Sequence, residues 1–234
     1  MYTLLLKRRG TQQAAKTSLT PAIAIADVVA GRETTGVNVS TMADKPWEEM
    51  QAAFKQDLSY LRTLAGSNEK DPYKQSLVDK YRPVVEKLKV THDSFGNLDV
   101  MWWFYQWQTD LGHLVDVYDD FRAAIEKGLT TPNSWKSNAQ TAFCDLIYQY
   151  SADNHEKGAS FQAHYLVDAV NDLLCGNLAV NAPLKVKMLR MVGHWAFDAG
   201  EKEKALRLYK MVMTLDPNKG GCKTRLKELE EEFE

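Results

Sequence analysis

The chain is poor in cysteine, and its cysteines form no pattern. Only three of 234 residues are cysteine, at Cys144, Cys175 and Cys222. No C-x-x-C pair occurs, so the sequence supports neither a zinc knuckle nor a dithiol redox pair. Isolated cysteines are most often buried thiols. We therefore expect reduced cysteines in a cytosolic protein.

The chain also lacks a long apolar run and an excess of positive charge. In MYTLLLKRRG the leucines precede the charges, which is the reverse of a signal peptide. The longest later apolar run, PAIAIADVVAG, is too short to span a bilayer. We expect a soluble protein without a membrane partner. The formal net charge of −2 offers nucleic acid no general attraction, so any basic surface must be local.

Patterns typical of catalysis are missing as well. NKGGCKT resembles the end of a phosphate-binding loop, but Cys222 stands where the final glycine is required, and no strand precedes it. The histidines show no H-x-H or H-x-x-x-H spacing; they are His92, His113, His155, His164 and His194. The sequence therefore indicates no nucleophile–base pair, no metal ligand set and no cofactor.

One group of acids leaves an alternative open. Asp116, Asp119 and Asp120 lie within little more than one helical turn and could share a face. A metal nuclease needs converging carboxylates of this kind. The simpler interpretation is a solvated face of an amphipathic helix.

Helical periodicity dominates what the sequence does contain. Asp44, Lys45 and Pro46 predict a helix start, with Asp44 as the N-cap and the proline inside the first turn. Spacings of three and four residues then form one apolar seam of Trp47, Met50, Phe54, Leu58 and Leu61.

A second helix is expected after Asp71 and Pro72, with a kink or break at Pro83. Residues 45–95 thus form a predicted helical hairpin and a candidate oligomerisation region. The alternative is that the seam only packs on the second helix and on the tryptophan-rich core.

Residues 96–234 continue the helical pattern. NLDVMWWFYQWQTDLG is apolar nearly all round and predicts a buried helix, and amphipathic segments follow it. No alternating strand pattern occurs beyond residue 45. The predicted fold is all-α and ends in a charged helix, GCKTRLKELEEEFE.

The segment VGHWAFDAGEKEKALRLYKMVMTLDPN matches the 34-residue helix-turn-helix repeat of the TPR type. Its small, aromatic and proline positions are Gly193, Gly200, Ala205, Tyr209 and Pro217. Residues 101–129 match less completely. Residues 96–234 are therefore interpreted as a TPR-like all-α layer whose hairpins serve as a platform.

Residues 1–44 differ from the rest of the chain. They are rich in Thr, Ala, Gly and Val, and up to residue 26 they carry Lys7, Arg8, Arg9 and Lys16 without an acid. We interpret them as a flexible basic arm or a small DNA-contacting module. A helix-turn-helix within residues 11–33 stays open. A second basic cluster, diluted by acids, contains Lys80, Arg82, Lys87 and Lys89.

The layout resembles the terminase small subunit of peduovirus-type tailed temperate phages. The resemblance rests on VMWWFYQWQTDLGHLVDVYDDFRAAIEKGLTTP, on VGHWAFDAGEKEKALRLYKMVMTLD, on KTRLKELEEE and on the hairpin over residues 47–88. It implies a homo-oligomeric ring in the host cytoplasm. Such a ring binds the packaging site of double-stranded phage DNA and delivers it to a large subunit with ATPase and nuclease activities.

Two alternatives belong to other classes. A TPR-like protein-interaction module would bind peptides and no nucleic acid, and a metal nuclease would act through Asp116, Asp119 and Asp120. The chain also departs from the family, whose members can end in a Lys/Arg-rich tail, because five of its last seven residues are acidic. That end could dock on the large subunit, or it could be a fraying surface helix.

Overall fold

The structure is a computed structural model that describes residues 40–218 and 220–233. Every regular element in these ranges is a helix, which confirms the all-α prediction. A 3-10 turn, η1 (Met42–Asp44), precedes α1 (Trp47–Thr63), α2 (Gly66–Thr91), α3 (Asp99–Asp110), α4 (Leu114–Glu126), α5 (Ala139–Glu156), α6 (His164–Cys175), α7 (Ala182–Asp198), α8 (Lys202–Leu215) and α9 (Lys223–Phe233).

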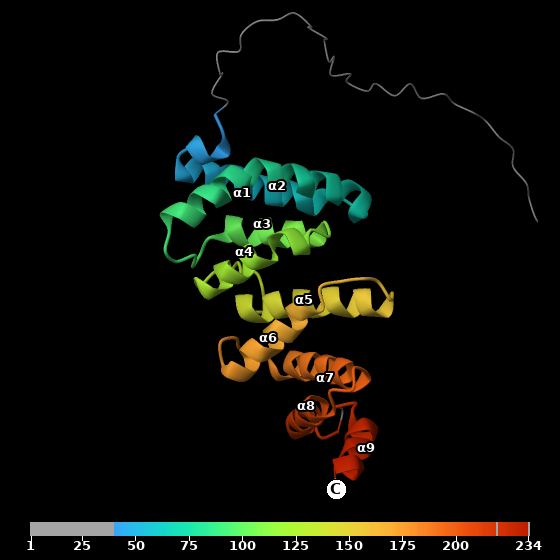
Figure 1. Ribbon diagram of the computed structural model, residues 1–234. Coiled ribbons are helices and arrows are strands. Elements are labelled where there is room, and N and C mark those ends of the chain that lie inside the picture. The colour runs from blue at the N-terminus through green and yellow to red at the C-terminus, as the bar shows by residue number, and fades with distance from the viewer. Residues whose placement is uncertain (1–39, 219, 234) are drawn as a thin grey trace, which may run out of the picture. The chain divides into compact units, whose positions relative to one another are not determined.

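The described helices pack mainly on their neighbours in sequence. Each helix contacts the next, from α1 on α2 to α8 on α9, and α5 also reaches α7 (Figure 1). Residues from Ser40 onward form one compact unit, so the predicted segments 45–95 and 96–234 lie in the same body. Such local packing buries apolar faces between successive helices, as in helical-repeat architectures.

Helix α3 is buried on nearly all sides, as its composition predicted. Trp102 and Trp107 are fully buried, and Gln106 and Gln108 are buried as well. Trp102 packs edge-to-face on Phe121 of α4, with ring centroids 5.5 Å apart. The helix has no polar face because α2 covers one side and α4 another.

The first hairpin differs from the prediction in two details. Helix α2 begins at Gly66 and continues through Pro72 and Pro83 without a break. An internal proline removes one backbone hydrogen bond. Here the neighbouring Tyr81 and Val85 are fully buried, so packing on α1 and α3 keeps the helix continuous.

The start of α1 is the other correction. Asp44 does not cap this helix. Its carboxylate accepts hydrogen bonds from the backbone N–H and the hydroxyl of Thr41, and Pro46 precedes the first helical residue, Trp47. Asp44 instead belongs to η1, which packs against α2.

Candidate interaction surfaces

The apolar seam of α1 divides into a buried and an accessible part. Met50, Phe54 and Leu61 are buried within the single chain, so their side chains serve its own core. Phe54 packs on Tyr81 and Trp107, with ring centroids 5.4 and 6.1 Å away. Trp47 is 41% exposed and Leu58 is half-buried. Of the five residues assigned to oligomerisation, these two offer surface to a neighbour.

A partly buried carboxylate fixes α1 on α2. Asp57 accepts hydrogen bonds from Lys80 Nζ and Tyr81 Oη at 2.6 Å each and from Tyr73 Oη at 3.0 Å. Burial, followed by the hydrogen bond to Asp57, raises the pKa of Tyr73 to about 12 and also raises the pKa of Tyr81. The hairpin therefore has a defined register, which places Trp47 and Leu58 at fixed positions on its surface.

Two hollows adjoin Trp47 and share it and Met50, so we treat them as one surface, the Trp47 groove. The wider hollow, about 370 Å³, lies between α1, the start of α3 and residues 131–133, which follow α4. Its lining includes Leu58, Lys55 and Asp99, whose pKa is raised by burial. The narrower hollow, about 170 Å³, lies between η1, α1 and α2. The groove is thus apolar at its centre, with charged side chains around it.

The second basic cluster is occupied by contacts within the chain. Lys80 pairs with Asp57, and Lys89 pairs with Asp120 of α4 at 2.6 Å. Burial lowers the pKa of Lys89, but its hydrogen bonds to Asp120 and Glu86 outweigh this effect and the net shift is upward. These amines already have carboxylate partners.

The other two members of that cluster are also engaged. The Arg82 guanidinium lies 5.6 Å from the centroid of the Phe104 ring. Lys87 Nζ donates to the carbonyl of Ala43 at 2.7 Å. The cluster is therefore dispersed around α2, and its cations support neighbouring elements.

The three clustered acids of α4 are exposed on its surface, and one of them forms an ion pair. Asp116, Asp119 and Asp120 are exposed, and Asp120 is neutralised by Lys89. Within residues 40–218 and 220–233, no three His, Cys, Asp or Glu residues are arranged to hold a metal ion. No helix of that part of the chain is long and apolar enough to cross a membrane.

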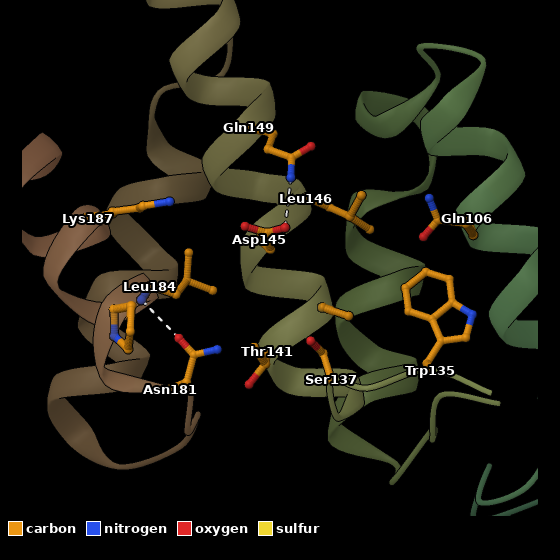
Figure 2. A pocket seen from close by; sticks show the side chains of 12 residues that line it. Gln106, Trp135, Ser137, Thr141, Asp145, Leu146, Gln149, Asn181, Leu184 and Lys187 are labelled. Atoms are coloured by element: carbon orange, nitrogen blue, oxygen red, sulfur yellow. Dashed lines mark hydrogen bonds between the residues drawn. The ribbon is translucent and has the colours of Figure 1, made fainter. Parts of the chain in front are cut away.

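A third surface, a groove of about 490 Å³, lies between α3, α5 and α7, and sequence reasoning did not find it (Figure 2). Asn138 and Asn181 cap α5 and α7 by accepting from the N–H of Thr141 and Leu184. Lys187 of α7 and Trp135 lie on opposite sides of the groove, and Asp145 of α5 lies between them. Its lining comes from three separate parts of the chain, Gln106, residues 135–149 and residues 181–187, so no local spacing could have revealed it.

Gln106 and Trp135 close the α3 side of this groove. Gln106 Nε2 donates to Asp110 at 2.7 Å, and Asp110 is paired with Lys74 at 2.8 Å. A carboxylate only accepts, so this contact fixes the amide orientation. Gln106 Oε1 then lies on the side nearer to Trp135 in Figure 2 and has no hydrogen-bond partner.

The predicted repeat segment forms the α7–α8 hairpin. Gly193 lies directly against Tyr209, because a Cβ there would be 2.8 Å from Tyr209 Cε1. Tyr209 and Ala205 are fully buried. Gly200 does not serve close packing, because nothing lies within 4 Å of the position that a Cβ would take. Its φ of +79° is in the left-handed region, which favours glycine.

The end of this hairpin leads into the acidic helix. Helix α8 ends at Leu215, just before Pro217, and α9 returns to pack on α8 through the buried Leu229. Three glutamates of α9 form ion pairs: Glu232 with Lys202, Glu230 with Lys210, and Glu231 with Lys227. The acidic helix is therefore docked on the chain, and its carboxylates remain accessible.

The basic residues assigned to DNA contact, Lys7, Arg8, Arg9 and Lys16, lie outside the described residues. So does the alternative helix-turn-helix of residues 11–33.

The described part of the chain is all-helical and has grooves on its surface. A family model described as the phage small terminase subunit matches residues 51–181, more than half of the chain. The chain therefore belongs to the phage small terminase subunit family. The match runs from within α1 to the residue before α7. No curated protein and no solved structure matches.

Proposed function

We propose that this small terminase subunit is a DNA-packaging adaptor of a peduovirus-type phage. It assembles into a homo-oligomeric ring in the host cytoplasm, recognises the packaging site on double-stranded phage DNA and delivers that DNA to the large terminase subunit. The observation that carries this proposal is the family match over residues 51–181. The catalytic work of cutting and pumping then belongs to the large subunit.

The distribution of charge supports DNA contact by the N-terminal segment. Residues 1–39 contain five basic residues and only two acids, whereas the remainder of the chain has more acids than bases. In the described part, the cluster on α2 is already engaged by Asp57, Asp120 and neighbouring groups. Phosphate neutralisation needs clustered lysine and arginine. Lys7, Arg8, Arg9 and Lys16 supply it in this proposal.

Assembly makes such a small cluster effective. Four cations bind DNA weakly, but a ring presents the cluster many times along one duplex, and effective concentration then raises the overall affinity. The exposed Trp47 and half-buried Leu58 give α1 the apolar surface for that assembly. Exposed apolar surface that adjoins a groove is typical of interaction sites.

The test separates DNA contact from assembly. A variant with Lys7, Arg8 and Arg9 each changed to Gln should keep the wild-type solution mass but lose most of its affinity for a phage DNA fragment. Its binding should also depend less on salt, because fewer counterions are released. The matched control changes Arg62, Lys136 and Lys157, three exposed basic residues outside the α2 cluster and the Trp47 groove, to Gln and should bind like wild type. Undiminished binding by the N-terminal variant would contradict this assignment.

A second candidate function is a peptide-binding module without nucleic-acid affinity. The groove between α3, α5 and α7 favours it, since a concave surface between helices whose lining includes Asp145 and Lys187 suits an extended peptide of mixed charge. A monomer that binds no DNA but binds a peptide of the large subunit, and loses it on Lys187→Glu, would establish this function instead.

A further inference from the structure

A closed ring places a geometric demand on each subunit. Ring interfaces are heterologous, so every subunit needs two different surfaces that complement each other. This inference rests on the proposed ring. The described residues offer one such pair: the Trp47 groove beside α1 and α2, and the accessible face of α9, at opposite ends of the helix series in Figure 1.

The narrow hollow of the groove has the size of one aromatic ring. Its volume is about 170 Å³, and its apolar lining comprises Met42, Ala43, Trp47, Met50, Val84 and Leu88. An engineered apolar cavity of about 150 Å³ in another protein binds benzene. The hollow is therefore suited to a phenyl group and too small for a typical ligand of drug size.

The ionisable side chains that line this hollow are all basic. They are Lys45, Lys87 and His92. The nearby Asp44 is held by Thr41, and Glu48 and Glu49 lie on the first turn of α1 outside the lining. The apolar centre with a basic margin fits a partner that presents an aromatic side chain among carboxylates.

Helix α9 presents that combination. Phe233 is 49% exposed, and Glu228, Glu231 and Glu232 on the same short helix are exposed too. Leu229 is buried against α8 and holds the helix in place. The other large exposed aromatic apart from Trp47 is Tyr60, which already packs edge-to-face on Tyr73 at 4.9 Å. Phe233 is therefore the exposed phenyl group of the described residues.

We propose that α9 of one subunit docks in the Trp47 groove of the next subunit. The Phe233 ring fills the narrow hollow, and the glutamates of α9 face Lys45, Lys87 and His92. Repetition of this contact joins subunits head to tail, and closure of the series produces the ring. In this arrangement the acidic helix α9 serves assembly.

Two charge substitutions test the contact from its two sides. Phe233→Lys places a cation in the apolar hollow beside lysines, and Trp47→Glu places a carboxylate opposite the α9 glutamates. Each should weaken subunit association about a hundredfold or more, because apolar burial is lost and like charges meet. Matched controls are Leu215→Lys and Val90→Glu, at exposed apolar positions outside the hollow, 42% and 87% exposed. Both controls should assemble like wild type. The circular dichroism spectra of all four variants should match that of the wild type.

Mixing the two defective variants gives the decisive result. The Trp47→Glu subunit keeps its α9 and the Phe233→Lys subunit keeps its groove, so one junction forms and growth stops. Light scattering should show each variant alone as a monomer and the mixture as a dimer. Rings from either variant alone would overturn this interface while leaving the ring itself intact. A monomeric wild-type protein would instead overturn the proposed ring. Two monomers that stay monomeric on mixing would also contradict the pairing of these surfaces.

Discussion

The two ends of the helix series are held together by different physical means. At the α1–α3 end, Phe54, Tyr81 and Trp107 form a buried aromatic cluster, with centroids 5.4 to 6.3 Å apart. At the α7–α9 end, His194 Nδ1 lies 2.7 Å from Tyr209 Oη, and Arg225 pairs with Asp198 at 3.0 Å. The α1–α3 end combines burial of large rings with the contacts of one carboxylate, Asp57. The α7–α9 end relies on close helix contact and on polar groups nearer the surface.

The two ends should therefore respond differently to changes in pH and salt. Burial of apolar area changes little with pH or salt. Polar contacts near the surface respond to both. The α1–α3 end, which carries the Trp47 groove, should therefore keep its shape over a wide range of conditions. The docking of α9 on α8 should be the more sensitive feature.

The largest effect is expected in the aromatic cluster. Trp107 is fully buried, and Trp107→Ala should lower the free energy of unfolding by about 3–5 kcal/mol. Urea denaturation at one protein concentration measures this loss. Tyr60→Ala, at a side chain 53% exposed, serves as the control and should lose much less. Similar losses for both variants would show that the cluster is not the main source of stability at this end.

An intermediate effect is expected where α7 meets α8. Gly193→Ala would place a Cβ 2.8 Å from Tyr209 Cε1 and 3.0 Å from Cδ1, against a fully buried ring. Overpacking of this kind costs about 1–3 kcal/mol. The better helix propensity of alanine returns only about 1 kcal/mol of this, so the net change is a loss of stability. We expect a lower unfolding midpoint.

A double-mutant cycle identifies the cause of that loss. In a Tyr209→Leu background the ring is absent, so Gly193→Ala should be neutral or stabilising. An equal penalty in both backgrounds would show that the ring is not what Gly193 accommodates.

A pH effect should be confined to the α7–α9 end. Burial, together with the charges of Arg225 and Arg190, lowers the pKa of His194 below 6.5, and Asp198 opposes the shift. The unfolded chain thus binds the proton more readily, and stability should fall as pH drops below about 6.5. It should level off below the folded-state pKa. Urea midpoints measured between pH 5 and 8 should lose this part of their pH dependence in the His194→Gln variant. An unchanged pH profile would show that His194 is not its source.

The smallest effect is expected on the surface of α9. Lys210 and Glu230 are 3.5 Å apart and about half exposed. Glu230→Gln should cost at most about 0.5 kcal/mol, because exposed ion pairs contribute little. Amide hydrogen exchange of α9 at low salt should rise slightly, and the difference should disappear at high salt. A large loss of protection would mean that this pair holds α9 on α8.

Sequence periodicity predicted most of the fold, since helix formation depends on local spacing. The uniformly apolar composition of α3 correctly placed it in the core. The continuity of α2 through Pro83 was not predictable, because it depends on packing by helices elsewhere in the chain.

The candidate surfaces were less predictable for the same reason. The seam of α1 gave no sign that Met50 faces inward while Trp47 remains exposed, since this depends on where α2 and α3 lie. The basic residues of α2 appeared free in sequence, but Lys80 and Lys89 meet Asp57 and Asp120, which are 23 and 31 positions away. Gly193 and Gly200 look alike in a repeat pattern and differ in backbone conformation and surroundings.

The most direct measurement is the solution mass of the purified protein by light scattering, with and without a duplex fragment of phage DNA. The account predicts a discrete assembly of many subunits that binds the duplex without dissociating. A monomer that ignores DNA would contradict the packaging adaptor and favour the peptide-binding module.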